Sequence, residues 1–264
     1  MTLLRRGSFA VRRLRETVST FDNGWSVLVQ MARRADELTY RVGDLTITAP
    51  NAPGARVPVY EVFAEDEYSL EWFAQGLGDA PTLVDIGAHI GCFSIAFASS
   101  VPGARVHVYE PTPSTGAFLS RNVEANGLSD RVTVHHQAVG AAAGALVMAD
   151  NGPGSGHNGV LHLGEAGSVE IEVPCVAIAD AVAAAGGHVD LVKMDAEGAE
   201  YDVVLNSSPD TWQGVRRIVM EYHALPGRDF SDIEAHLASA GLDLVRRDRY
   251  SEGLGLAWFS RDAV

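Results

Sequence analysis

Short apolar runs alternate with segments of helical spacing over most of the chain, and this alternation limits the fold more than any other feature. Helical patterns such as 92–100, 114–127 and 230–241 follow apolar runs at 82–87, 105–110, 131–136, 189–195 and 215–221. Runs made almost wholly of Val, Ile and Leu are typical of parallel strands whose two faces are both covered by helices. The alternation therefore predicts a doubly wound α/β sheet.

The two ends of the chain depart from this alternation. Residues 1–80 have an irregular pattern, with a half-buried strand predicted over 41–50 and helical spacing over 61–77, so we predict an N-terminal cap. The last two predicted strands, 242–250 and 254–260, have only a turn between them. Strands joined in this way pair antiparallel, so a C-terminal antiparallel hairpin should close one edge of the sheet.

One connection inside the main domain, which we place at 81–264, is unusually long. Residues 149–168 are rich in Gly, Ser and Asn and exceed the usual length of a connection in a compact domain. We expect an inserted functional loop here, because it falls at the same region of the sheet as the motifs described next.

Composition and charge exclude several classes of function. The 264 residues are 47% hydrophobic, enough for a sizeable core, and the net charge of −14 opposes a protein that neutralises nucleic-acid phosphates. Arginines interrupt the short apolar runs of residues 1–18, so we predict an amphipathic first helix, no membrane span and a cytoplasmic protein. Cys92 and Cys175 share no ligand spacing with histidines, which predicts neither a disulfide framework nor a zinc site.

The turn "LVDIGAHIGCF" at 83–93 follows the first predicted strand of the sheet. In open α/β sheets, ligands bind outside the carboxyl ends of the strands. Gly87 and Gly91 would let the backbone approach a ligand, but a dinucleotide cradle would have glycine in place of His89 and no carboxylate as close as Asp85. The ligand should therefore carry a cationic group and hydroxyls, as an amino-acid moiety and a ribose do, with His89 beside it.

The next two strand ends complete this predicted ligand site. Glu110 stands at the tip of the second strand in "VYEP", where its carboxylate can accept hydrogen bonds from both hydroxyls of a ribose, and Pro111 follows it. Gln137, Ala138 and Val139 follow the third strand and are predicted to lie beside an adenine ring.

Several motifs together resemble those of class I S-adenosylmethionine-dependent methyltransferases, and more narrowly those of the FkbM family. They are "DIGAHIGCFS", "YEPTPSTGAFLSRNVEANG", "LVKMDAEGAEYDVV" and "VMEYH", and the resemblance covers residues 57–260. It implies a Rossmann-like seven-stranded methyltransferase sheet, S-adenosylmethionine as cofactor and S-adenosylhomocysteine as product. It also implies a small hydroxylated acceptor of natural-product or sugar modification, and a cap in which Tyr68 folds over the methionine end of the cofactor.

The signature residues Lys193 and Asp195 lie at the end of the predicted fourth strand. Asp195 leaves a buried strand at the point toward which the methyl group of the cofactor should be directed. Lys193 is the only lysine in the chain, and the alternation of side chains puts it on the same side as Asp195, so an ion pair could keep that carboxylate ionised. Glu197 and Glu200 begin the next helix and could be partners of its dipole.

A hydroxyl acceptor must lose its proton to a base. His223 stands just past the fifth strand, where the neutral form of a histidine suits a base at about pH 7. Asp195, Glu221 and His157 are the other candidates. We predict no metal dependence, because Lys193 competes for the charge of Asp195.

Two alternatives to an oxygen acceptor stay open. The aromatic side chains of the cap could hold an indole-like acceptor that is methylated at ring carbon or nitrogen; they are Trp25, Tyr60, Phe63, Trp72 and Phe73. The chain could also be a non-catalytic cofactor-binding module, although such a module has no need of Asp195. The expected partner is a small-molecule acceptor, and a homodimer is left open.

Overall fold

The computed structural model describes residues 3–52, 54–156, 158–164 and 168–262 of the chain. Its centre is a seven-stranded sheet in the order β11-β12-β10-β9-β3-β4-β5. Neighbours from β10 to β5 pair parallel, whereas β12 runs antiparallel to both β10 and β11. This confirms the predicted seven-stranded sheet and its C-terminal hairpin. The strands are β3 (Thr82–Ile86), β4 (Arg105–Tyr109), β5 (Val132–His135), β9 (Val189–Met194), β10 (Val215–Tyr222), β11 (Asp243–Ser251) and β12 (Leu254–Ser260).

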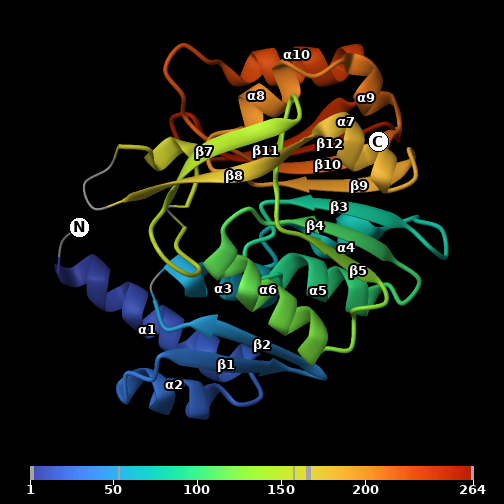
Figure 1. The fold of residues 1–264 in the computed structure, drawn as a ribbon. Helices are drawn as coiled ribbons and strands as arrows, with labels where there is room; N and C mark the ends of the chain where they lie inside the picture. Colours follow the sequence, from blue (N-terminus) through green and yellow to red (C-terminus); the bar gives the residue numbers. More distant parts are fainter. Residues whose placement is uncertain (1–2, 53, 157, 165–167, 263–264) are drawn as a thin grey trace.

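Helices cover both faces of this sheet, as a doubly wound fold requires (Figure 1). One face carries α7 (Ile178–Ala184), α8 (Glu200–Leu205), α9 (Pro209–Gln213) and α10 (Phe230–Ser239), and the other carries α5 (Cys92–Ser100) and α6 (Pro113–Ala125). Helix α5 is buried all round from Cys92 to Ala98, because it lies between the sheet and the cap. This explains why its sequence has no polar stripe.

The cap is more regular than its sequence pattern suggests. It consists of α1 (Leu3–Thr20), α2 (Gly24–Ala32), β1 (Glu37–Val42), β2 (Leu45–Pro50), η1 (Gly54–Arg56), α3 (Val57–Phe63) and α4 (Leu70–Ala74). The single strand predicted over 41–50 is wrong, because the chain turns at Gly43, with a φ of +55°, and pairs β1 with β2. The helical run predicted over 61–77 is likewise divided, since Asp66 and Ser69 have φ values of +46° and +54°.

The cap and the sheet share one buried apolar cluster. Phe21, Tyr40 and Phe73 of the cap belong to the same cluster as Leu83 of β3 and Phe97 of α5. The division of the chain at residue 80 stays a prediction, and the cap packs on the sheet as part of this common core.

A second, three-stranded sheet was not predicted. Strands β6 (Ala138–Gly140), β7 (Gly144–Asp150) and β8 (Val169–Ala177) pair in the order β6-β8-β7, and the short helix η2 (Val160–His162) lies between β7 and β8. The predicted loop 149–168 is the connection between these two strands, although its first two residues belong to β7. No helix in the described part of the chain is long and apolar enough to cross a membrane.

Candidate active site

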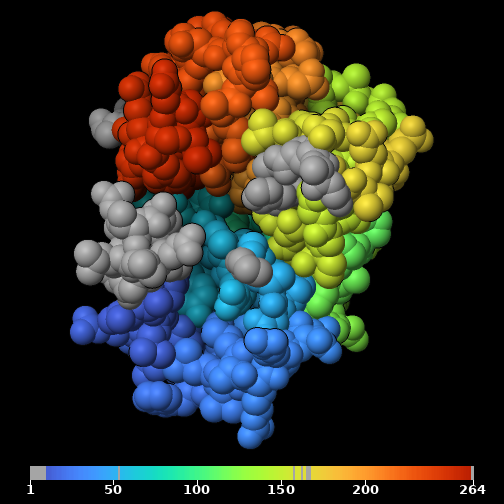
Figure 2. All heavy atoms as spheres, turned by 90° about the vertical axis from the view of Figure 1, so that its left-hand side faces the viewer, coloured from blue at the N-terminus to red at the C-terminus, as the bar shows by residue number. Residues whose placement is uncertain are grey.

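A cavity of about 370 Å³ opens at the carboxyl ends of β3, β4 and β9. The strand order reverses between β3 and β9, and open α/β sheets bind their ligands at such a point. Figure 2 shows the molecule hollowed on this side, between the blue and cyan cap and the yellow to red C-terminal half. The predicted site residues that line the cavity are Tyr68, Gly87, His89, Glu110, Pro111, Gln137, Ala138, Val139, Lys193, Asp195 and Glu221.

The glycines of the turn serve packing more than ligand approach. A Cβ atom at Gly87 would lie 1.7 Å from the carbonyl oxygen of Asp195, so the turn can press against the end of β9 only with glycine there. Gly91 has a φ of +89° ahead of α5, and a Cβ atom there would meet the side chain of Leu119 at 2.6 Å. Gly91 is not among the described residues that line the cavity.

Glu110 joins the turn to the tip of β4. Its two carboxylate oxygens accept hydrogen bonds from the backbone N–H groups of His89, at 3.0 Å, and Thr112, at 2.8 Å. Burial raises the pKa of Glu110 to about 7. Burial also lowers the pKa of His89 to about 4, which favours a neutral ring at this place. Ala138 and Val139 add an apolar wall beside them.

Asp85 lies behind the turn and not in the cavity. It is fully buried, its Oδ2 accepts a hydrogen bond from Ser94 at 2.6 Å, and its Oδ1 lies 3.4 Å from Nζ of Lys193. The same Lys193 ammonium donates to the carbonyl oxygen of Gly87 at 2.7 Å. The predicted contact between Asp85 and a cationic ligand therefore has no support, because the protein supplies its own cation there.

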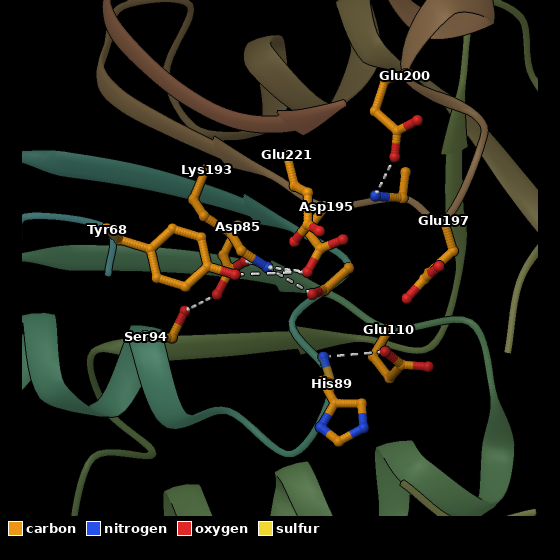
Figure 3. A network of polar contacts seen from close by, with 12 residues as sticks. Tyr68, Asp85, His89, Ser94, Glu110, Lys193, Asp195, Glu197, Glu200 and Glu221 are labelled. Carbon is orange, nitrogen blue, oxygen red and sulfur yellow. Dashed lines mark hydrogen bonds and ion pairs between the residues drawn. The ribbon is translucent and has the colours of Figure 1, made fainter. Parts of the chain in front are cut away.

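Of the two aspartates that face Lys193, Asp195 is the one that lines the cavity (Figure 3). Its Oδ2 accepts a hydrogen bond from the hydroxyl of Tyr68 at 3.5 Å and lies 3.8 Å from Nζ of Lys193, so the expected ion pair is present but is longer than the one to Asp85. Its Oδ1 is buried and has no hydrogen-bond partner among the described residues. Tyr68 of the cap lines the cavity, and its place over the methionine end of the cofactor stays a prediction.

His223 lies among carboxylates and is not one of the described cavity-lining residues. Its Nδ1 is 3.2 Å from Glu200, and its Nε2 is 3.5 Å from Glu197 and 3.7 Å from Glu221. Burial lowers the pKa of His223, but the hydrogen bond to Glu200 and the surrounding negative charges outweigh burial and raise it to about 10. These contacts favour the protonated imidazole and so oppose the predicted neutral histidine base, which stays a prediction. His157 lies outside the described residues.

Sequence reasoning missed two carboxylates of the cavity: Glu197, expected only as a partner of the helix dipole, and Glu61 in helix α3 of the cap. Burial raises the pKa of Glu61 to about 8, and repulsion from Glu67 and Asp195 acts in the same direction. The helical spacing of the cap showed that residue 61 belongs to an amphipathic segment. Nothing in that spacing shows which side of a cap meets the cavity.

Donor atoms of Asp195, Glu197 and His223 lie within 4.8 Å of one another, a spacing that a metal ion could bridge. Both ring nitrogens of His223 face carboxylates, however, so His223 and these carboxylates also form an ion-pair cluster. Independence of metals stays a prediction, which would be contradicted if a chelator abolished activity.

The chemistry of the cavity fits S-adenosylmethionine. Glu110 is a buried carboxylate at the strand end where nucleotide-binding sheets hold a ribose, and the apolar wall at Ala138 and Val139 suits an adenine ring. The unpartnered oxygen of Asp195 and the nearby Glu221 suit the positive charge of the methionine end.

Comparison with known proteins agrees with this assignment. Methyltransferase sdnD of Sordaria araneosa is 27% identical over 215 residues, which cover 70% of this chain and 81% of that protein. The 31-O-demethyl-FK506 methyltransferase FkbM of Streptomyces tacrolimicus is 27% identical over 228 residues, covering 76% and 86%. The fold is similar to that of an S-adenosylmethionine-dependent methyltransferase from Agrobacterium tumefaciens, with a TM-score of 0.50 at 9% identity over 86% of this chain and 71% of that chain.

The family itself follows from the signature region. Residues 85–244 match the family described as the methyltransferase FkbM domain, a span that runs from the aspartate of β3 to the start of β11 and contains the Glu110, Asp195 and Glu221 strand ends. The chain therefore belongs to the FkbM methyltransferase family and is an S-adenosylmethionine-dependent methyltransferase.

Proposed function

We propose that the protein methylates a hydroxyl oxygen of a small-molecule acceptor. The observation that carries this proposal is the group of carboxylates Asp195, Glu221 and Glu61, which line the cavity together. Figure 3 shows Asp195 and Glu221 side by side and apart from Glu110. An alcohol must give up a proton to become methylated, and carboxylates are proton acceptors. The cavity of about 370 Å³ is in the range that encloses small ligands.

The protein's own residues have separate tasks in this proposal. When bound, S-adenosylmethionine supplies the methyl group as an already activated electrophile. Glu110 accepts hydrogen bonds from the ribose, Ala138 and Val139 pack on the adenine, and Tyr68 covers the methionine end from the cap. Asp195 orients the positively charged end, so that proximity and alignment supply most of the acceleration.

The relatives support an acceptor from natural-product modification. The Streptomyces tacrolimicus relative is named for the methylation of 31-O-demethyl-FK506, and the matched region covers 86% of that relative. The net charge of −14 opposes a nucleic-acid acceptor.

The alternative of an aromatic acceptor loses its main argument. Of the cap aromatics, Trp25 is 71% exposed, whereas Phe73 and Tyr60 are packed in the core. None of the five aromatic residues named for this alternative is among the described residues that line the cavity. An acceptor methylated at ring carbon or nitrogen would have to be held by Tyr68, Phe93 or Tyr109 instead.

A screen of acceptors tests the proposal. Purified protein is incubated with S-adenosylmethionine and a panel of alcohols, phenols, amines and indoles, and products that gain one methyl group are located by mass spectrometry and NMR. We expect a new methyl ether. A product methylated at carbon or nitrogen would contradict the oxygen assignment, and binding of S-adenosylhomocysteine without any turnover would favour a non-catalytic module.

A further inference from the structure

A chain of three ionisable side chains leads from the core behind α8 to the cavity. Glu200 is fully buried and accepts hydrogen bonds from the backbone N–H groups of Ala196, at 2.9 Å, and Gly198, at 3.2 Å. Its Oε1 also lies 3.2 Å from Nδ1 of His223, which is 8% exposed. The other ring nitrogen of His223 lies 3.7 Å from Oε1 of Glu221, and Glu221 lines the cavity.

We propose that Glu221 takes the proton from the acceptor hydroxyl, and that the buried Glu200–His223 ion pair is the positioning device that holds Glu221 ready. This inference rests on the proposed oxygen methylation. In the step, the hydroxyl oxygen forms its bond to the methyl carbon as the carbon–sulfur bond breaks, and the electron pair of that bond stays on sulfur. The hydroxyl proton passes to Glu221 and then to solvent, so charge and atoms balance.

Two other carboxylates of the cavity are less suited to this task. Asp195 is already engaged by the protein, because its Oδ2 accepts the Tyr68 hydroxyl and faces the Lys193 ammonium. Glu197 packs against the connection between β7 and β8. Its carbonyl oxygen accepts a hydrogen bond from the backbone N–H of Leu161 at 3.0 Å, and a Cβ atom added at Gly159 would lie 2.4 Å from the Cβ of Glu197.

Glu221 instead lies on a strand of the central sheet, between the cofactor side and the cap. The negative groups near Glu221 are Asp195, Glu61 and Glu197, and the cations near it are His223 and Lys193. Burial raises the pKa of Tyr68 and Tyr250, and the charge of Glu221 acts on both in the same direction. A strand end holds a catalytic group more firmly than a loop does. Of the described carboxylates, Glu221 thus combines access to the cavity with a rigid support and a paired cation.

The charge state of Glu221 should depend on the cofactor. Burial raises the pKa of Glu221 and repulsion from Asp195 adds to this, while the positive charge of His223 opposes both. The carboxyl group therefore keeps its proton in the empty cavity at neutral pH. A positive charge at the methyl position adds to the effect of His223 and lowers the pKa of Glu221. Binding of a cationic ligand should therefore release the proton of Glu221 and leave a carboxylate that can act as a base.

Calorimetry with two ligands tests this without a known acceptor. Sinefungin carries an ammonium group near the place of the transferred methyl, whereas S-adenosylhomocysteine carries an uncharged sulfur. Binding enthalpies are measured at about pH 7.5 in buffers of different ionisation enthalpy, which yields the number of protons released. We expect sinefungin to release up to about one proton more than S-adenosylhomocysteine.

Matched variants assign that proton. In Glu221→Gln the difference between the two ligands should vanish, while Glu170→Gln, at an exposed residue of β8, should keep it. Equal release for both ligands in the native protein, or loss of the difference in Glu197→Gln with retention in Glu221→Gln, would overturn the assignment. If neither ligand binds, the cofactor site described above is wrong, which is a separate failure from this one.

A second measurement tests the positioning role of Glu200. NMR of the imidazole nitrogens should show His223 as a cation up to at least about pH 9, and Glu200→Gln should lower its titration midpoint. The same variant should reduce the sinefungin-linked proton release, because a neutral His223 no longer favours ionised Glu221. A purely structural Glu200 would lower the stability and leave both readouts unchanged in the folded fraction, and that result would refute its role.

Discussion

Glu110 contacts the glycine turn and, in the proposed mode, the ribose, so its replacement affects both contacts. It binds the backbone of the glycine turn through His89 and Thr112, and in the proposed mode it also accepts the ribose hydroxyls. Glu110→Ala should weaken binding of S-adenosylhomocysteine by about 2–3 kcal/mol, the worth of hydrogen bonds to a charged group. Isothermal calorimetry measures this loss.

The pH dependence of the same binding adds a check. Because burial raises the pKa of Glu110 to about 7, its carboxylate is lost as the pH falls through that value, and affinity should fall with it. Glu124→Ala, on the exposed side of α6, serves as the control and should bind normally. Unchanged affinity in a folded Glu110→Ala protein would make the residue purely structural.

Lys193 and Asp85 form a pair that is buried from solvent almost completely, with 4% and 0% exposure. Removing one partner leaves the other charge without compensation in the core. Lys193→Met should therefore lower the free energy of unfolding by about 3–5 kcal/mol, as measured by denaturation with urea.

The double variant Lys193→Met/Asp85→Asn provides the control for that prediction. It removes both charges and should recover a large part of the loss, because the expense arises from the unpaired carboxylate. If the double variant loses as much free energy of unfolding as Lys193→Met and Asp85→Asn lose together, the two side chains act independently.

The signature string was enough to predict which residues gather at the site, but not which of them meet the ligand. Alternation along β9 correctly put Lys193 and Asp195 on one side. The direction of Lys193 toward Asp85 depends on the neighbouring strand β3, and the cation on His223 depends on Glu200 and Glu197, which are remote in sequence from it. Such charge states follow from burial and from contacts across elements, which no local pattern encodes.

At the scale of elements, helix α6 holds the cap through asparagine side chains. Asn122 is 1% exposed; its Oδ1 accepts from the backbone of Thr48 in β2, and its Nδ2 donates to the carbonyl oxygens of Thr48 and Ile90. Asn122→Ala leaves these backbone groups without partners. We expect a loss of about 2–4 kcal/mol in the free energy of unfolding, since each unsatisfied buried group costs about 1–3 kcal/mol.

Hydrogen exchange locates the effect of that substitution. The amide of Thr48 should exchange faster in Asn122→Ala, while amides of β9 in the central sheet should keep their relative protection. Asn206→Ala, at an exposed side chain that donates a hydrogen bond to Asp202, should leave the exchange rate of the Thr48 amide unchanged. Uniform acceleration across the molecule would mean global destabilisation without specific loosening of the cap.

Strands with continuous apolar runs were the predictable elements, and strands with mixed faces were not. The runs of β3, β4, β9 and β10 are buried on both sides, so composition alone identifies them. Strand β8 is exposed at several positions along its length, and its partner β6 has three residues. Short or exposed strands owe their pairing to partners distant in sequence, and this small sheet could not be foreseen for that reason.

For the whole molecule, the acidic cavity links stability to pH. Burial raises the pKa of Glu61 to about 8 and that of Glu110 to about 7, from a model-compound value of 4.5, so the folded state binds more protons than the unfolded chain. The resulting stabilisation is complete below about pH 4.5 and is lost as the pH rises through 7 and 8. His223, raised from 6.5 to about 10, acts in the same direction at higher pH.

The protein without cofactor should therefore melt several degrees lower at about pH 9 than at about pH 6. Differential scanning calorimetry at matched ionic strength measures the two transitions. In the variant Glu61→Gln/Glu221→Gln the decline should be shallower, because two of the groups no longer titrate. A melting temperature that rises between these two pH values would contradict the cavity's charge states.

The solitary lysine has a consequence for chemical labelling. Lys193 is the only lysine in the chain, and the other basic residues besides histidine are arginines. The ammonium group of Lys193 donates to the carbonyl oxygen of Gly87, and the residue is 4% exposed. An acylating reagent that reacts with amines thus has one side-chain target, which lines the cavity of the candidate active site. The rate at which Lys193 is acylated should rise when the Gly87 turn opens and should fall when S-adenosylhomocysteine is bound. Acylation of Lys193 can therefore be used to measure opening of that turn.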